Sequence, residues 1–301
     1  MVALRVLADL RPLRARFLVL GSASPALLRQ TSESLAGRIT YVELGGLDLS
    51  EVGPGSLERL WLRGGFPRSL LARSEETSRT WRRDFIRDFL QRDLPQLGVR
   101  IATETLRRFW TMLAHYHGQV WNAAEFARSF AVADTTVRRY LDQLTATFGV
   151  RQLRPWHQNI AKRQVKAAKV YIADSGLLHS LLGIHDVGEL RGHPKAGASW
   201  EGFALETVAR RLNAHPEACY FWRTHTGAEL DLLVVHGRRR LGLEFKLTDS
   251  PTLTPSLRSA LADLRLTSLD VVHAGKQAYA LGPKVRALPL ALVARELEPL
   301  R

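Results

Sequence analysis

Apolar residues in the first part of the chain occur as short runs rather than at helical spacing. Residues 17–21 are apolar up to a final glycine, which is typical of a buried strand in a parallel sheet. We expect a helix through 25–28 and a second strand over 39–44. A strand, a helix and a strand predict an α/β unit. Residues 1–70 are too few for a complete doubly wound domain, so we interpret them as a remnant.

Apolar positions in residues 71–185 recur at the spacing of amphipathic helices. Asp134 can cap the N-terminus of the last of these helices. The pattern predicts helices over 81–90, 104–116, 122–130 and from 134, and extended segments over 150–156 and 169–173. A short helix, a turn, a capped helix and two extended segments together predict a winged helix-turn-helix.

The third helix of a winged helix-turn-helix is the one that meets base edges or phosphates. In this chain its N-terminal half carries hydroxyl and guanidinium groups, and the predicted wing at 159–166 is basic and can contact backbone phosphates. The candidate nucleic-acid-binding residues are Thr135, Thr136, Arg138, Arg139, Lys162, Arg163 and Lys166. Packing between domains and docking of a protein are the alternative uses of such a module.

Residues 186–301 contain a pattern that predicts a β-hairpin. Residues 228–235 and 240–247 predict two strands, and Gly237 supplies the backbone freedom that the tight turn between them needs. A boundary loop is expected over 192–197. The other predicted elements are a helix over 200–212, a helix over 257–264, a strand over 268–273 and a last structured segment over 285–294.

Two carboxylates and a lysine converge on this hairpin. Because side chains alternate across a strand, Glu244 and Lys246 share one face, and Asp231 comes from the neighbouring strand. Two carboxylates from adjacent strands can hold one Mg²⁺ or Mn²⁺, and a lysine beside them can orient water or neutralise phosphate charge. The alternative is a surface salt bridge on an amphipathic strand.

Asp231, Glu244 and Lys246 stand in the motif positions of the PD-(D/E)xK nuclease-like fold, which this region resembles. That fold usually adds an acidic residue from a preceding helix, and the resemblance implies Glu201 in this role, with Glu206 as the second choice. It also implies cleavage of phosphodiester bonds with a metal held by Asp231, Glu244 and Glu201. Retention of the same strands for packing alone is the competing interpretation.

Charge points to a polyanionic partner. The 301 residues include 43 Lys and Arg against 29 Asp and Glu, a formal net charge of +14. Such an excess favours a nucleic acid, most simply DNA, although an Arg-rich composition also fits a GC-rich genome. The length predicts two or three domains.

The number of cysteines and the length of the apolar runs indicate in which cellular compartment the protein is expected. Cys219 is the only cysteine, so the sequence has no disulfide framework and no zinc cluster, which favours a reducing cytoplasm. The sequence has no apolar run long enough to span a membrane, and its start lacks the features of a secretory signal. We therefore expect a cytoplasmic protein without a membrane partner, and we leave open a homo-oligomer or a protein partner.

The motifs in their order resemble a prokaryotic family of ATP-binding proteins, and the resemblance covers essentially the whole chain. These proteins join an AAA-type ATPase domain to a winged helix and a C-terminal DUF4143 domain. The resemblance implies an α/β multidomain chain with an ATPase remnant at 1–70, a helical winged-helix region at 71–185 and a restriction-endonuclease-like α/β domain at 186–301. It rests on the segments 20–25, 34–39, 63–67 and 171–177, together with Glu201 and the hairpin residues.

The chain departs from this family at the nucleotide site. The phosphate-binding pattern Gly-x-x-x-x-Gly-Lys-[Ser/Thr] is absent from the sequence, and Met1 is expected to fall just after the part that would contain it. Backbone amides and the lysine of that loop cradle the phosphates, so ATP is not expected to bind this chain alone. The resemblance places Ser22 at a sensor position and makes Arg38 a charge-stabilising arginine, and both roles are expected to be vestigial.

The sequence thus predicts a truncated member of this family that binds nucleic acid and has a nuclease-like C-terminal domain. A non-catalytic regulator or scaffold, and an inactive fragment of a full-length ATPase, are the alternatives.

Overall fold

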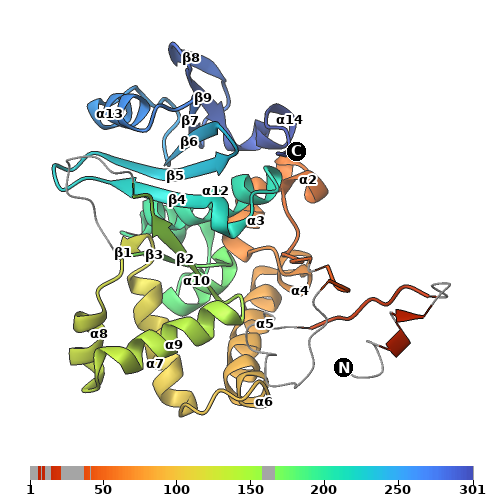
Figure 1. The fold of residues 1–301 in the computed structure, drawn as a ribbon. Helices are drawn as coiled ribbons and strands as arrows, with labels where there is room; N and C mark the ends of the chain where they lie inside the picture. Colours follow the sequence, from red (N-terminus) through yellow and green to blue (C-terminus); the bar gives the residue numbers. More distant parts are fainter. Residues whose placement is uncertain are drawn as a thin grey trace.

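A mixed β-sheet runs through the protein, and helices pack against it on both sides (Figure 1). This computed structural model describes residues 6–7, 9–10, 15–21, 37–40, 42–157 and 167–300. The expected α/β class is confirmed. The AAA-type, winged-helix and nuclease-like assignments within it stay predictions.

Nine strands of the described residues form one sheet in the order β1-β3-β2-β4-β5-β6-β7-β9-β8. The strands are β1 Gln119–Val120, β2 Val150–Pro155, β3 Lys169–Ile172, β4 Cys219–Arg223, β5 Glu229–His236, β6 Arg239–Lys246, β7 Ser268–His273, β8 Tyr279–Gly282 and β9 Val285–Pro289. Pairs β2–β4, β6–β7 and β7–β9 are parallel, and the other pairs are antiparallel. In the pair β2–β4, Arg154 is opposite Tyr220, so strands from both halves of the chain belong to one sheet.

Helices α5 (Glu75–Asp88) and α8 (Ala123–Phe130) of the first half begin at a side-chain cap. Ser74 accepts a hydrogen bond from the backbone N–H of Thr77 at the start of α5, and Asn122 accepts one from Ala124 at the start of α8. The helices are α2 Leu49–Val52, α3 Leu57–Arg63, α4 Pro67–Leu70, α5 Glu75–Asp88, α6 Leu94–Gln96, α7 Thr103–His115, α8 Ala123–Phe130 and α9 Asp134–Ala146. A π-helical turn, Phe89–Asp93, links α5 to α6.

The helices of the second half pack partly against helices of the first half and partly against the C-terminal strands. They are α10 Ser175–Leu182, α11 Val187–Gly192, α12 Ala196–Arg211, α13 Pro255–Asp263 and α14 Val293–Glu296. In the described ranges, no helix is long and apolar enough to cross a membrane.

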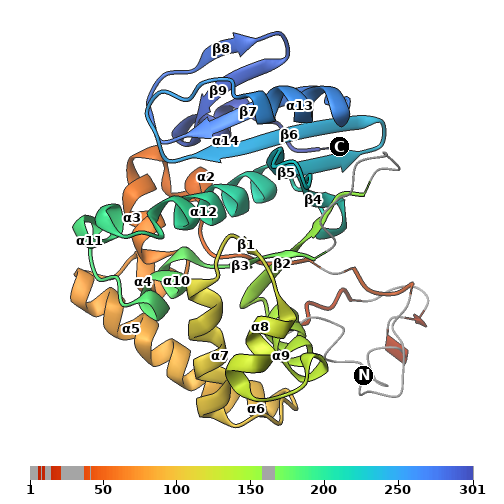
Figure 2. The same cartoon turned by 90° about the vertical axis from the view of Figure 1, so that its left-hand side faces the viewer.

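Helices α12 and α13 cover opposite faces of the C-terminal strands (Figure 2). Leu232 belongs to the core under α12, and its neighbour Leu233 belongs to the core under α13. This alternation follows from the two-residue period of a strand. A third core lies among α5, α7, α8, α9 and α10 and includes the buried side chains of Phe109, Trp110 and Phe126.

The elements predicted from residue 81 onward are present, with shifted ends. The hairpin forms as predicted: His236 pairs with Arg239, and Gly237 adopts a positive φ of 57°. Two details were wrong. Asp134 is the first residue of α9 rather than its cap, because Ala133 occupies the N-cap position. The expected loop over 192–197 is shorter than predicted, since α11 ends at Gly192, residues 193–195 form a bend and a turn, and α12 begins at Ala196.

The two strands predicted near the N-terminus are wrong. Residues 17–21 form no strand, and the side chains of Leu18 and Leu20 are 86% and 81% exposed. Residues 39–40 and 42–44 are also not in a strand, and Leu44 is 94% exposed. The physical reason is that a strand needs a neighbour for its backbone hydrogen bonds, and none of the described residues pairs with these segments. The helix predicted over 25–28 lies outside the described residues.

Candidate functional site

The hairpin β5–β6 places the predicted acids beside one another. The backbone N–H of Asp231 donates to Glu244 Oε2 over 3.3 Å, and the N–H of Phe245 donates to Asp231 Oδ2 over 3.0 Å. Lys246 Nζ lies 2.7 Å from Glu244 Oε1, on the same side of β6. Asp231 and Glu244 are buried, while about half of the Lys246 side chain is exposed.

Helix α12 and strand β3 complete this group. Glu201 on α12 accepts a hydrogen bond from the Tyr171 hydroxyl, 2.6 Å from Oε1. Lys169 Nζ lies 3.2 Å from Glu201 Oε1, 3.3 Å from Asp231 Oδ1 and 2.5 Å from Glu229 Oε1. We call Glu201, Glu229, Asp231 and Glu244, with Lys169 and Lys246, the carboxylate cluster.

The structure therefore brings together Glu201, Asp231, Glu244 and Lys246. Glu206, the second choice on α12, lies elsewhere, because its carboxylate pairs with Arg151 of β2, with Oε2 2.9 Å from Nη2. Sequence reasoning missed Lys169, whose only local signal was its place at the start of a predicted extended segment.

Burial sets the protonation of the cluster. It raises the pKa of Glu244 to about 8 and that of Glu201 to about 7, and the charge of Asp231 adds to both shifts. Burial alone would lower the pKa of Lys169, but the surrounding oxygens of Tyr171, Asp231, Glu201 and Glu229 outweigh it and hold that pKa above its usual value. The lysine is therefore the charged partner of acids that titrate near neutral pH.

The position of Lys169 bears on whether a divalent metal fits here. A metal would be held by Asp231, Glu244 and Glu201, but the ammonium group already contacts two of these three side chains. Among the described residues, no group of three or more His, Cys, Asp or Glu is arranged to hold a metal ion. The residues do not fit a metal in this arrangement.

A second buried polar region lies on the other side of α12, where the segments 63–67 and 171–177 meet. Asp174 caps α10 and accepts hydrogen bonds from the N–H groups of Gly65, at 2.8 Å, and Leu177, at 2.9 Å. A Cβ on Gly64 would lie 2.1 Å from Asp174 Oδ1, and one on Gly176 would lie 2.1 Å from the Arg63 carbonyl oxygen. Only glycine fits at these two contacts.

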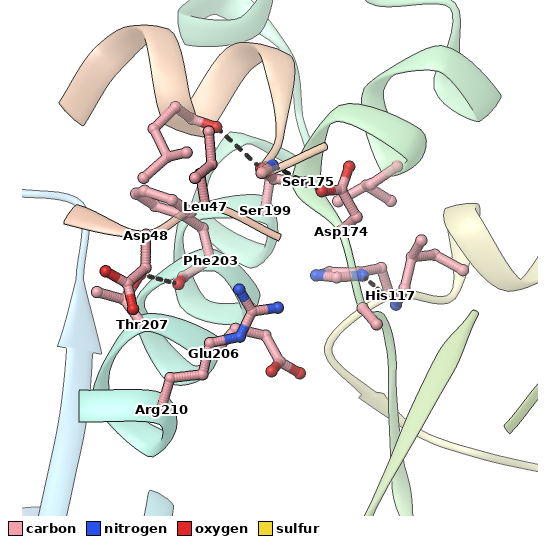
Figure 3. Close-up of a pocket in the computed structure, with 16 residues that line it drawn as sticks. Leu47, Asp48, His117, Asp174, Ser175, Ser199, Phe203, Glu206, Thr207 and Arg210 are labelled. Atoms are coloured by element: carbon pink, nitrogen blue, oxygen red, sulfur yellow. Dashed lines mark hydrogen bonds between the residues drawn. The ribbon is translucent and has the colours of Figure 1, made fainter. Parts of the chain in front are cut away.

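The two segments border a small cavity of about 30 Å³ (Figure 3). Asp174 and His117 lie on one side of it, and Glu206 and Arg210 of α12 lie on the other. We call Gly64, Gly65, Asp174 and Gly176, with His117 and His179, the motif junction.

Neutral histidines complete the motif junction. His179 Nδ1 donates to the Leu62 carbonyl over 2.9 Å, so Nε2 accepts from the Ser199 hydroxyl over 2.7 Å. His117 Nδ1 accepts from the N–H of Ile172 over 3.0 Å. Burial lowers the pKa of His117 to about 3 and that of His179 to about 4. Both rings are uncharged near neutral pH, which suits a packing role.

Helix α9 presents its predicted contact residues to solvent. Thr135, Arg138 and Arg139 are exposed, and Thr136 is half-buried. The Arg138 guanidinium lies 5.6 Å from the centre of the Trp121 ring. The opposite face of α9 packs into the core through Val137, Tyr140, Leu141 and Leu144. The wing residues Lys162, Arg163 and Lys166 lie outside the described residues.

Of the two residues assigned to an ATPase remnant, Arg38 is not brought to either region. Arg38 Nε lies 2.6 Å from Asp9 Oδ1, in an ion pair at the surface. Ser22 lies outside the described residues.

Comparison with known families defines the class of the C-terminal part. Residues 196–293 match DUF4143, a domain of unknown function, so the chain carries a DUF4143 domain as the resemblance predicted. Residues 55–187 match a second domain of unknown function, DUF8612. The boundary between the two matches falls between β3 and β4.

Similar proteins come from mycobacteria. Uncharacterised proteins of Mycobacterium bovis and Mycobacterium tuberculosis are each 55% identical to this chain over 286 residues. The matched region covers 95% of this chain and 64% of each relative, so the chain spans less than two thirds of their length. No solved structure matches the chain.

Proposed function

We propose that this chain is a nucleic-acid-binding protein, in which a winged-helix module holds a DNA duplex beside a nuclease-like DUF4143 domain. The observation that carries the proposal is the exposed N-terminal half of α9, with Thr135, Arg138 and Arg139 in solvent and the other face buried. Three helices, α7, α8 and α9, followed by the antiparallel pair β2–β3, have the order of such a module. The net charge of +14 supports a polyanionic ligand.

The test is fluorescence anisotropy of a labelled DNA duplex at several salt concentrations. Each lost phosphate contact weakens binding to all sequences and lowers the salt slope by about one unit, so Arg138→Ala/Arg139→Ala is expected to lower it by about two. Arg258→Ala/Lys276→Ala is the matched control, because it removes the same charge from exposed positions in the DUF4143 domain. An unchanged affinity and slope in the α9 variant would contradict the proposal and favour docking of a protein.

A second candidate function is phosphodiester hydrolysis at the carboxylate cluster. The convergence of Glu201, Asp231, Glu244 and Lys246 from one helix and two strands favours it. Lys169 opposes it, because its ammonium group stands among the acids that would hold Mg²⁺ or Mn²⁺. A plasmid-nicking assay with either metal decides: nicking by the wild type that Asp231→Ala/Glu244→Ala abolishes would establish the nuclease. DNA binding without nicking would support the DNA-binding function and contradict the nuclease function.

A further inference from the structure

Lys169 is an unusual residue for its position. Only 3% of its side chain is exposed, although a lysine is rarely buried without a strong partner. Its Nζ lies within 3.3 Å of oxygens from Glu201, Glu229 and Asp231. An ammonium group has three N–H donors and no acceptor, so each donor can take one carboxylate.

We infer that Lys169 is the built-in cation of the carboxylate cluster and occupies the place that a divalent metal would need. The cluster is therefore complete without a metal ion. This inference is independent of the proposed nucleic-acid function, since it concerns only the contacts of the buried side chains.

The backbone holds Lys169 in place. In strand β3 it pairs with Leu153 of β2 on one side and with Val120 of β1 on the other. The Nζ atom also lies 5.7 Å from the centre of the Phe221 ring, which favours a cation. Because both neighbouring strands fix the main chain, the ammonium group cannot leave the acids by a shift of a free loop.

A divalent ion would compete with this lysine directly. Mg²⁺ and Ca²⁺ bind oxygens at about 2.0 to 2.6 Å. An ion bound by both Asp231 and Glu201 would therefore lie directly beside the ammonium group of Lys169. Repulsion between the two cations, in a buried setting where screening is weak, opposes binding. Removing the charge at position 169 while keeping the length of the side chain should therefore create a metal site.

The experiment is calorimetric titration of the full chain with Mn²⁺ near neutral pH. We expect no saturable binding by the wild type. Lys169→Met should bind at least about tenfold more tightly, a difference of about 1.4 kcal/mol, and Lys169→Met/Asp231→Asn should lose the gain. Lys169→Arg keeps a cation and should remain like the wild type. Circular dichroism and thermal unfolding establish that each variant is folded.

Two results would overturn the inference. One is saturable Mn²⁺ binding by the wild type that Asp231→Asn removes, and this result is decisive even where Lys169→Met does not fold. The other is equal Mn²⁺ affinity in folded Lys169→Met and Lys169→Arg, because the charge at position 169 would then not control the site.

Discussion

Helix α12 borders two buried polar regions that are stabilised in different ways. In the carboxylate cluster, the acids are offset by the ammonium groups of Lys169 and Lys246. In the motif junction, Asp174 is held by two backbone N–H groups, and the histidines are neutral and hydrogen-bonded. The first region combines carboxylates with ammonium groups, whereas the second holds one carboxyl group, that of Asp174, beside neutral histidines. The difference shows that buried carboxylates of one protein can be stabilised either by buried cations or by backbone N–H donors.

Their pH responses should also be opposite. A histidine with a lowered pKa in the folded state loses stability as pH falls, because the unfolded chain binds the proton first. A carboxyl group with a raised pKa loses stability as pH rises, because the unfolded chain releases the proton first. A fall in pH below about 6.5 should therefore weaken the contribution of the histidines in the motif junction, and a rise in pH from about 4.5 to about 8 should weaken the carboxylate cluster.

The largest effect is expected from Gly176→Ala, which breaks the motif junction. The new Cβ would lie 2.1 Å from the Arg63 carbonyl oxygen, and a backbone atom cannot move aside as a side chain can. We expect unfolding free energy to fall by about 4 kcal/mol, measured by urea denaturation. Gly197→Ala is the control, since a Cβ on that helical glycine would meet no neighbouring side chain within 4 Å and should change stability little. Equal effects of the two substitutions would contradict the tight contact.

The next effect is that of Lys169→Met, which breaks the carboxylate cluster. Loss of one partner leaves buried acids without their cation, and unfolding free energy should fall by about 3 kcal/mol near neutral pH. Lys246→Met is the matched control, because about half of that side chain is exposed and its ion pair should contribute less than about 1 kcal/mol. Urea denaturation of both variants measures the difference, and a similar loss in both would contradict the role of Lys169.

Glu244→Gln tests how the stability of the carboxylate cluster depends on pH. The folded-state pKa of about 8 lies above the unfolded value of about 4.5, so the contribution of this carboxyl group is complete below about pH 4.5 and is lost as pH rises through 8. Between about pH 5 and about pH 7 the wild type should lose about 2.5 kcal/mol that the neutral amide does not lose. Urea denaturation at both pH values measures it, and parallel profiles would refute the raised pKa.

His117→Gln tests how the stability of the motif junction depends on pH. It has the smallest expected effect. With a folded-state pKa of about 3, the contribution of this ring is complete above about pH 6.5 and is lost as pH falls. At about pH 5 the loss in the wild type should be about 2 kcal/mol, and the variant should show a shallower acid slope. The glutamine oxygen can still accept from Ile172, so the slope rather than the absolute stability is the quantity to compare. An unchanged slope would mean that His117 does not titrate in this way.

Much of the site could be predicted because its signals are local. The two-residue period of 228–235 and 240–247 and the turn at Gly237 predict the hairpin, and the hairpin brings Asp231 next to Glu244. The resemblance to a nuclease-like fold pointed to Glu201 on the preceding helix, which the structure places beside Asp231 through Lys169.

Lys169 could not be predicted because its contacts depend on long-range pairing. It lies 62 positions before Asp231, and it reaches the cluster only because β2 pairs with β4 in parallel. No pattern along the chain specifies that pairing. The strands expected over 17–21 and 39–44 failed for a related reason, since an apolar run indicates a tendency to be buried but does not supply a neighbouring strand.

The parallel pair β2–β4 has a consequence for how such proteins are assembled from parts. Lys169 belongs to the segment that matches DUF8612, whereas Glu201, Glu229 and Asp231 belong to the DUF4143 domain. A gene fusion that placed this DUF4143 domain beside another neighbour would carry the acids along but leave the ammonium group behind. The transplanted domain would need a cation from its new neighbour or from solution, so we expect the two segments to be inherited together.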